Sequence, residues 1–253
     1  MELLKKLRFI NSNGLKLLAA ALMFVDHLGL LIFPDIAWLR VIGRFSMPLF
    51  AFMISEGCRY TRNKYKHFFL LFGVGVLCQL VYTIVDPNTI YLGILLTFSI
   101  STLIIYAMQY AKKCFFEQNA KLFKQIFSSM LFLSLVIGAY ALTQFILVDY
   151  GFWGIMMPVF ASLFDFRNIS LPTDWNDLDC LPLRILCMLI AELLLIISIP
   201  NPPFQLPSIL IFPLLLLYNG NKGKANLKHF FYIFYPVHLG LLQAVAYALY
   251  LFT

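Results

Sequence analysis

The chain has 253 residues, of which 61% are hydrophobic and only 12% are charged, and its formal net charge is +7. Soluble domains carry about 25% charged residues, so the composition excludes an ordinary soluble domain. The apolar segments do not alternate apolar and polar residues, which argues against a transmembrane β-barrel. Because cytoplasmic loops of membrane proteins collect Lys and Arg, we interpret the positive charge as a topology signal, and we expect no nucleic-acid partner.

The first long apolar segment, 15–33, contains two ionisable residues, Asp26 and His27. Its length of about 19 residues is enough to cross the hydrocarbon core of a bilayer as a helix. We expect a retained helix with Ser12 or Asn13 as the N-cap, because the run is too long for a signal peptide and no cleavage site follows it. An ionisable residue at the centre of such a helix costs at least ~2.5–3.5 kcal/mol. This pair is therefore the first candidate for chemistry.

Asp26 and His27 are neighbours on one helix, so their side chains point about 100° apart. A direct bond between them is unfavourable, and we expect each to face a different partner on an adjacent helix. With an unperturbed pKa near 6.5, His27 suits general-base catalysis at neutral pH, and Asp26 suits a buried arginine. The alternative is a polar cluster that only fixes helix register.

The second segment, 38–57, contains Arg44. We expect Asp26 to be its partner, because an arginine at that depth needs one. Arg44 is then either an oxyanion or substrate-anion site, or half of a structural salt bridge.

Four cations follow the second segment within eight residues: Arg59, Arg62, Lys64 and Lys66. They are either a topology signal or a grip on an anionic cofactor such as the phosphates of coenzyme A.

Nine apolar segments in all predict an all-α, polytopic helical membrane protein forming one integral membrane domain over 1–253. They are 15–33, 38–57, 68–85, 91–111, 126–148, 152–164, 183–199, 206–218 and 230–252. The sixth and eighth are short and contain prolines, so we expect re-entrant or broken helices there. The polar stretch 165–180 has four aspartates and is either a solvated connector or a lid over an entrance.

A cytoplasmic N-terminus places all but two of the 19 Lys and Arg residues in joints on the cytoplasmic side, the exceptions being Arg40 and Arg44. This asymmetry predicts a multi-pass protein of the cell membrane whose C-terminus lies outside. The five cysteines have no metal-ligand or disulfide spacing, and we expect no metal site.

The last segment contains His238, two residues after Pro236. Proline removes one backbone hydrogen bond and bends a helix, which makes His238 a second candidate base or ligand. The alternative is a structural histidine bonded to a neighbouring helix. Asn219 lies in the Gly-rich basic turn 218–224, which lacks the spacing of a P-loop.

Four stretches, LKLLAAALMFVDHLG, LRVIGRFSMPLFAFMISEGCRYTRN, LLYNGNKG and FFYIFYPVHLGLL, resemble the TraX family of membrane proteins. The resemblance extends over nearly the whole chain. TraX-like proteins are associated with acetylation of the N-terminus of conjugative pilin, and they resemble multi-pass acyltransferases of type 3, which take acetyl groups from acetyl-CoA. The positions that match are Asp26, His27, Arg44, Glu56, Arg59, Asn219, Tyr235 and His238.

The resemblance implies a membrane acetyltransferase that uses acetyl-CoA and an acceptor amine or hydroxyl, such as the pilin N-terminus or a surface glycan. We assign catalysis to His27, Asp26, Arg44 and His238, and coenzyme A binding to Arg59, Arg62, Lys64 and Asn219. The alternative is a non-catalytic transporter or a component of pilus or envelope assembly. The absence of a detectable internal repeat disfavours a transporter.

Overall fold

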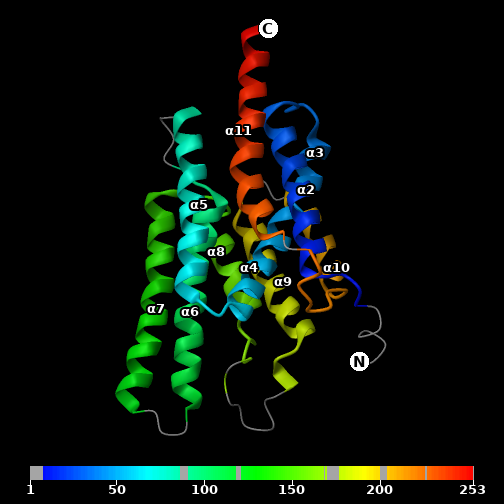
Figure 1. Ribbon diagram of the computed structural model, residues 1–253. Coiled ribbons are helices and arrows are strands. Elements are labelled where there is room, and N and C mark those ends of the chain that lie inside the picture. The colour runs from blue at the N-terminus through cyan, green and yellow to red at the C-terminus, as the bar shows by residue number, and fades with distance from the viewer. Residues whose placement is uncertain are drawn as a thin grey trace. The chain divides into compact units, whose positions relative to one another are not determined.

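The computed structural model describes residues 8–85, 91–117, 121–167, 169, 177–199, 204–225 and 227–252. Within them the chain is helical, apart from one parallel pairing of β1 (Tyr91–Leu92) with β2 (Leu147–Val148) and one isolated bridge between Ile10 and Tyr218. Figure 1 shows the helices. They are α2 (Ser12–Leu31), α3 (Ala37–Gly43), α4 (Ser46–Tyr60), α5 (Lys64–Val85), α6 (Ile94–Phe116), α7 (Leu122–Phe145), α8 (Gly151–Ala161), α9 (Leu181–Ser198), the 3₁₀ helix η3 (Leu206–Ile211), α10 (Phe212–Leu215) and α11 (Lys228–Phe252).

The predicted fold class is confirmed. Among the described residues, six helical segments are long and apolar enough to cross a membrane, with Ala37–Tyr60 taken as one of them. Three shorter apolar helices, Gly151–Ala161, Leu206–Leu215 and Ile233–Leu249, coincide with the other predicted segments. The chain is thus a multi-pass membrane protein.

Two segments depart from a single straight helix. The second is interrupted at Arg44 and Phe45, which separate α3 from α4. The eighth is broken, as expected, into η3 and α10, and each of these begins with a proline in its first two positions. Proline is tolerated there because the first N–H groups of a helix have no intrahelical acceptor.

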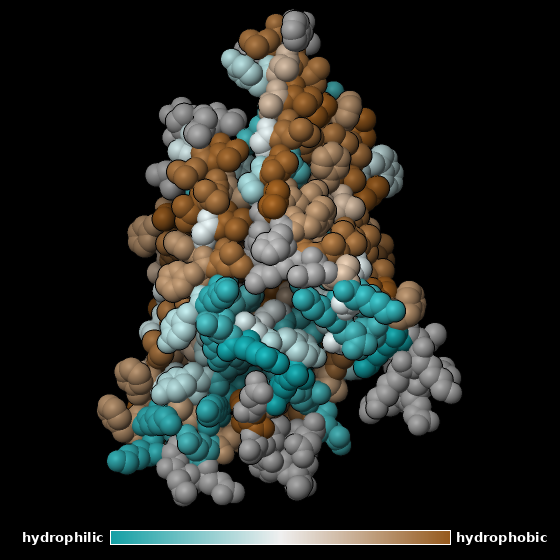
Figure 2. All heavy atoms as spheres, viewed as in Figure 1, coloured by the Kyte–Doolittle hydropathy of each residue, from teal (hydrophilic) through white to brown (hydrophobic). Residues whose placement is uncertain are grey.

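The surface reflects the same division into apolar and polar parts. The outward side of α7 is apolar, with Phe123, Ile137 and Phe145 all more than half exposed. Figure 2 shows hydrophobic residues over much of the helical surface and hydrophilic residues gathered where α4 ends and α5 begins. A helix with such an apolar exposed side is matched to lipid acyl chains.

The chain divides into two compact units. The first comprises Met1–Met53, Val76–Thr89 and Ile196–Thr253, and the second comprises Ile54–Gly75 and Ile90–Leu195. The organisation of the whole chain as one membrane domain stays a prediction.

In the first unit, α2 packs against α3 and α11. The N-cap of α2 is Asn11, whose side-chain oxygen accepts the N–H of Gly14 at 2.9 Å. The expected caps, Ser12 and Asn13, lie one and two residues too far along the chain, inside the first helical turn. The Asn13 side chain instead donates to the carbonyl of Ala225 at 2.6 Å.

The contact between α2 and α3 depends on two glycines. A Cβ at Gly43 would overlap the Cα and Cβ of Asp26, and a Cβ at Gly29 would lie 2.6 Å from the Cβ of Leu39. Small residues of this kind let helix backbones approach closely in membranes. The two helices are therefore closer than any larger residue at these positions would permit.

In the second unit, α6 and α8 supply most of a buried apolar cluster that includes Ile104, Met108 and Ile155. A buried ion pair joins α9 to α4 beside it. Nη1 of Arg184 lies 2.7 Å from Oε1 of Glu56, and both side chains are 5% exposed. Arg184 also donates to Oγ of Ser55 and to the carbonyl of Ala161. This hydrogen bonding compensates the desolvation of both charges.

We predict that Gly43→Ala lowers the unfolding temperature in detergent. The added methyl overlaps Asp26, so the helices must separate, and overpacking of this kind costs about 1–3 kcal/mol. The matched control is Gly138→Ala on α7, where a Cβ meets nothing within 4 Å. Alanine has the higher helix propensity, so the control should unfold at or above the wild-type temperature. Equal unfolding temperatures for Gly43→Ala and the wild type would contradict the close-packing interpretation.

We also predict that Arg184→Ala destabilises the protein by about 3–5 kcal/mol, because it leaves the Glu56 carboxylate buried without its cation. The double variant Glu56→Leu/Arg184→Leu should recover much of that loss. Lys124→Ala provides the control, since it removes an exposed ion pair with Glu117 whose side chains are 44% and 46% exposed. Exposed pairs contribute little. The measurement is chemical unfolding in detergent, and a double variant no more stable than Arg184→Ala would sink the prediction.

Candidate functional site

Helices α2 and α11 bring two histidines into contact. Nε2 of His238 lies 3.3 Å from Nδ1 of His27, and the ring centroids are 5.2 Å apart with the planes inclined at 55°. The two residues are 211 positions apart in the sequence, so only the packing of α11 on α2 unites them. His27 and His238 were predicted independently as candidate bases, and the structure places them together.

The surrounding carbonyl groups fix the protons of both neutral rings. Nδ1 of His238 lies 2.8 Å from the carbonyl oxygen of Phe234, and Nδ1 of His27 lies 3.0 Å from that of Met23. A carbonyl only accepts, so each Nδ1 carries a hydrogen. The bare Nε2 of His238 can then share the Nδ1–H of His27 with the Met23 carbonyl, which is the nearer acceptor. The lone pair of His27 is consequently on Nε2, which makes no hydrogen bond to the described residues.

This arrangement suits His27 for proton abstraction. A proton taken up at its Nε2 creates an imidazolium whose Nδ1–H already has two acceptors, the Met23 carbonyl and Nε2 of His238. A base whose far nitrogen is held by a third group is the common geometry of base-assisted catalysis. His238 is itself held firmly, because its ring stacks on Phe234 at 4.7 Å and meets Tyr235 edge-on at 5.4 Å.

Asp26 faces α3, as expected, but its ion-pair partner differs from the prediction. Nη1 of Arg40 lies 2.7 Å from Oδ2 of Asp26 and 3.2 Å from its carbonyl oxygen. Arg44 interacts with Asp26 electrostatically but lies at the end of α3, as the C-cap residue. The ion pair that the structure shows for Asp26 is therefore with Arg40, and a functional role for Arg44 stays a prediction. The long Arg40 side chain reaches Asp26 because Gly43 lets the two helices approach.

The first unit also contains Asn219, which has a local structural role. Its N–H donates to the carbonyl of Ile10 at 2.9 Å, and its side-chain oxygen accepts the N–H of Asn221 at 2.8 Å. These bonds tie the Gly-rich turn to the residues just before α2. A further role in coenzyme A binding stays a prediction.

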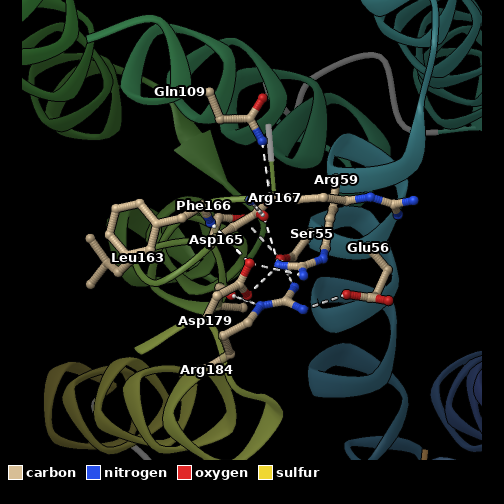
Figure 3. A network of polar contacts seen from close by, with 12 residues as sticks. Ser55, Glu56, Arg59, Gln109, Leu163, Asp165, Phe166, Arg167, Asp179 and Arg184 are labelled. Carbon is tan, nitrogen blue, oxygen red and sulfur yellow. Dashed lines mark hydrogen bonds and ion pairs between the residues drawn. The ribbon is translucent and has the colours of Figure 1, made fainter. Parts of the chain in front are cut away.

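The second unit contains a charged network that Figure 3 displays around Arg59. Nη1 of Arg59 lies 2.7 Å from Oδ1 of Asp165 and 2.6 Å from Oδ1 of Asp179. Its Nη2 also donates to Oδ2 of Asp179 at 3.0 Å, so Asp179 is bound through both oxygens. Arg59 was predicted to bind the phosphates of coenzyme A, and in the structure it is bound by two carboxylates.

A lysine and a glutamine support this network. Nζ of Lys112 donates to the carbonyls of Ser162 and Leu163 at 2.9 and 2.6 Å, at the end of α8. Nε2 of Gln109 lies 3.3 Å from Oδ2 of Asp165. The interpretation of 165–180 as a solvated connector is wrong for its two ends, because Asp165 is 3% exposed and Asp179 is bound to Arg59.

Four members of the network were not predicted from the sequence: Asp165, Asp179, Lys112 and Arg184. One available signal was charge balance, since Glu56 lies among apolar residues and needs a cation nearby. Within the described part of the chain, no group of three or more His, Cys, Asp or Glu side chains is placed to hold a metal ion.

Comparison with known proteins identifies relatives over most of the chain. The model of the family described as TraX protein matches residues 11–246. A protein of Dichelobacter nodosus named "Probable fimbrial assembly protein FimC, serogroup H1" is 27% identical over 238 residues, which cover 90% of this chain and 92% of the relative. An uncharacterized protein of Rickettsia prowazekii (strain Madrid E), RP591, is 30% identical over 102 residues, covering 40% of this chain and 39% of the relative.

No solved structure matches the chain. The family match includes α2 with Asp26 and His27, the α3–α4 region, and α11 as far as residue 246. It thus contains every residue of both polar sites described above. The chain belongs to the TraX family of membrane proteins.

Proposed function

We propose that the protein is a membrane acyltransferase that moves an acetyl group from acetyl-CoA to an acceptor amine or hydroxyl. The single observation that supports this most is the contact between His27 and His238 within apolar helices, with the Nε2 lone pair of His27 left available. Ionisable residues inside membrane-spanning helices have a free-energy cost, and they are rare there unless they have a function. The TraX family match and the fimbrial relative favour a pilin-like acceptor over a glycan.

In the proposed reaction, Nε2 of His27 takes the proton of the acceptor as its nitrogen or oxygen attacks the thioester carbonyl carbon. The new carbon–heteroatom bond forms while the carbonyl oxygen gains negative charge. Collapse of that intermediate breaks the carbon–sulfur bond, and the departing thiolate receives the proton held by His27. His238 is a positioning residue here, because it accepts the Nδ1–H of the imidazolium. We assign to Arg44 the stabilisation of the negative charge on the carbonyl oxygen. A donor in this role lowers the barrier by about 2.7–4 kcal/mol in other acyl transfers.

We assign binding of the acetyl-CoA phosphates to the cations of the turn between α4 and α5. Arg62 and Lys66 are exposed, and the ammonium of Lys64 lies over the Tyr106 ring at 5.0 Å. With a cytoplasmic N-terminus, the basic asymmetry of the joints puts this turn on the side where acetyl-CoA is made. The proposed location is therefore the cell membrane, with the C-terminus outside.

A second candidate function is a non-catalytic role in fimbrial or envelope assembly. The printed name of the Dichelobacter relative favours it, since that name refers to assembly and not to catalysis. In that case the two histidines would fix the packing of α11 on α2. Measurements of coenzyme A binding and of acetyl transfer distinguish the two functions, because only the acyltransferase requires that binding and that transfer.

We predict that His27→Ala lowers the rate of acetyl transfer in membranes by about 10²–10⁴-fold, as loss of a general base does. His238→Ala should lower kcat by a smaller factor and leave KM for acetyl-CoA unchanged, because it removes one of the two acceptors of Nδ1–H of His27 and leaves the Met23 carbonyl in place. Radiolabelled acetyl-CoA and a purified acceptor give the rates. Ser134→Ala on the exposed side of α7 is the control. Full activity of a properly inserted His27→Ala protein would refute the assignment of the base.

We further predict that coenzyme A raises the unfolding temperature of the wild-type protein in detergent. A ligand at 100 times its Kd stabilises the folded state by ~2.7 kcal/mol. The control ligand is pantetheine, which lacks the adenosine phosphates and should stabilise less. An unchanged unfolding temperature at millimolar coenzyme A would favour the non-catalytic assembly role.

A further inference from the structure

The two aspartates that bind Arg59 are not equivalent. Asp165 is 3% exposed, and its carboxylate also accepts from Nε2 of Gln109 and from the backbone N–H of Arg167, each at 3.3 Å. Asp179 is 16% exposed and, among the described residues, accepts from Arg59 and from the N–H of Phe166 at 3.3 Å. Asp165 is thus the inner, fixed partner, and Asp179 is the outer one.

Asp179 binds Arg59 as a phosphate would. Its two oxygens meet Nη1 and Nη2 at 2.6 and 3.0 Å, which is the paired arrangement by which a guanidinium recognises carboxylates and phosphates alike. Nε of Arg59 is buried and makes no hydrogen bond to the described residues. Arg59 therefore still has a donor to offer to a ligand with more oxygens than a carboxylate.

The residues around Arg59 carry positive charge that the described acids do not neutralise. Four cations close to it in the sequence or the fold have no ion pair with a described carboxylate: Arg62, Lys64, Lys66 and Arg167. The Arg167 guanidinium lies over the ring of Tyr60, 4.0 Å from its centroid, and Tyr60 is 47% exposed. A ligand with a charge of −2 or more is better matched to this surface than one carboxylate.

We propose that Asp179 occupies a phosphate site on Arg59 and that a phosphate group of a nucleotide-like ligand displaces it. Asp165 stays in place and keeps Arg59 oriented during the exchange. This inference rests on the proposed function for the identity of the ligand, which is the phosphorylated adenosine end of coenzyme A. The exchange leaves the Asp179 carboxylate free to enter water and replaces it with a dianion that the nearby cations attract.

The inference predicts that removing the internal carboxylate improves ligand binding. The probe is adenosine 3′,5′-bisphosphate, which needs no acyl transfer to be measured, and its Kd is determined by calorimetry on the full chain in phosphatidylcholine nanodiscs. Asp179→Asn should bind the probe roughly tenfold more tightly than the wild type, since the ligand no longer competes with a charge-assisted pair. Asp177→Asn is the matched control, because Asp177 is exposed and lies two residues before Asp179, so the substitution removes the same charge outside the pair with Arg59.

Arg59→Lys supplies a second, independent test. Lysine keeps the charge but lacks the fork that binds two oxygens, so the probe should bind roughly tenfold more weakly. In the Arg59→Lys background, Asp179→Asn should lose most of its effect, because the two residues act on one another. This variant leaves the Asp179 segment intact and keeps the proposal testable if Asp179→Asn does not fold.

Equal Kd values for the wild type, Asp179→Asn and Arg59→Lys overturn the phosphate site. An equal gain in Asp177→Asn overturns it too, because the effect is then a general one of charge. A lipid phosphate has the same chemistry, so the titration is repeated in phosphatidylglycerol nanodiscs. If the probe binds in phosphatidylcholine but not in phosphatidylglycerol, the lipid phosphate competes for the site, and the result supports the proposal. If the protein retains phosphatidylglycerol but binds the probe in neither lipid, the nucleotide assignment is overturned. Acetyl transfer without these binding changes would leave the acyltransferase standing and remove only the Asp179 exchange.

Discussion

The close approach of α2 and α3 at Gly43 is the constraint on which the first polar site depends. With no side chain at position 43, the α3 backbone lies directly against Asp26, and Arg40 reaches both the carboxylate and the carbonyl oxygen of that residue. The rotation of α2 about its own axis is thereby fixed. His27 follows Asp26 by one residue and so must face about 100° away, toward α11. One glycine contact thus orients both ionisable residues.

The second unit compensates its buried charges with a network of ion pairs and hydrogen bonds. Its network contains two arginine–carboxylate clusters, Arg59 with Asp165 and Asp179, and Arg184 with Glu56. Lys112 joins it through backbone carbonyl groups, that of Asp165 among them. Buried ion pairs add little net stability compared with apolar residues, but breaking one is costly. The network therefore acts mainly as a specific connection between α4, α9 and the two ends of the 165–179 segment. Its members differ in exposure, and this difference separates a fixed interior pair from an outer pair that water reaches.

Much of the fold could be predicted from the sequence, because apolar length and proline position are local properties. The nine apolar segments coincide with described helices, and the two histidines were identified because each is costly inside an apolar run. The angle between Asp26 and His27 likewise follows from helix geometry alone. The choice of Arg40 over Arg44 did not follow, because it depends on how closely two helix backbones approach. The partners of Arg59 were missed for a related reason, since Asp165 and Asp179 lie in a polar stretch whose composition is equally compatible with a solvated loop.

The chemistry of two neutral histidines explains why this site suits an apolar setting. Asp26 is already paired with Arg40, so it adds little net charge near His27. In the resting state neither ring needs to be charged, and burial of the pair costs less than burial of a histidine with a carboxylate. In the proposed reaction, the imidazolium and the oxyanion arise together and disappear together. Their attraction is strengthened by the low dielectric and exists only while the barrier is crossed. An interaction confined to the transition state accelerates the step without tightening substrate binding, which is the advantage that a carboxylate partner, charged throughout, would not give.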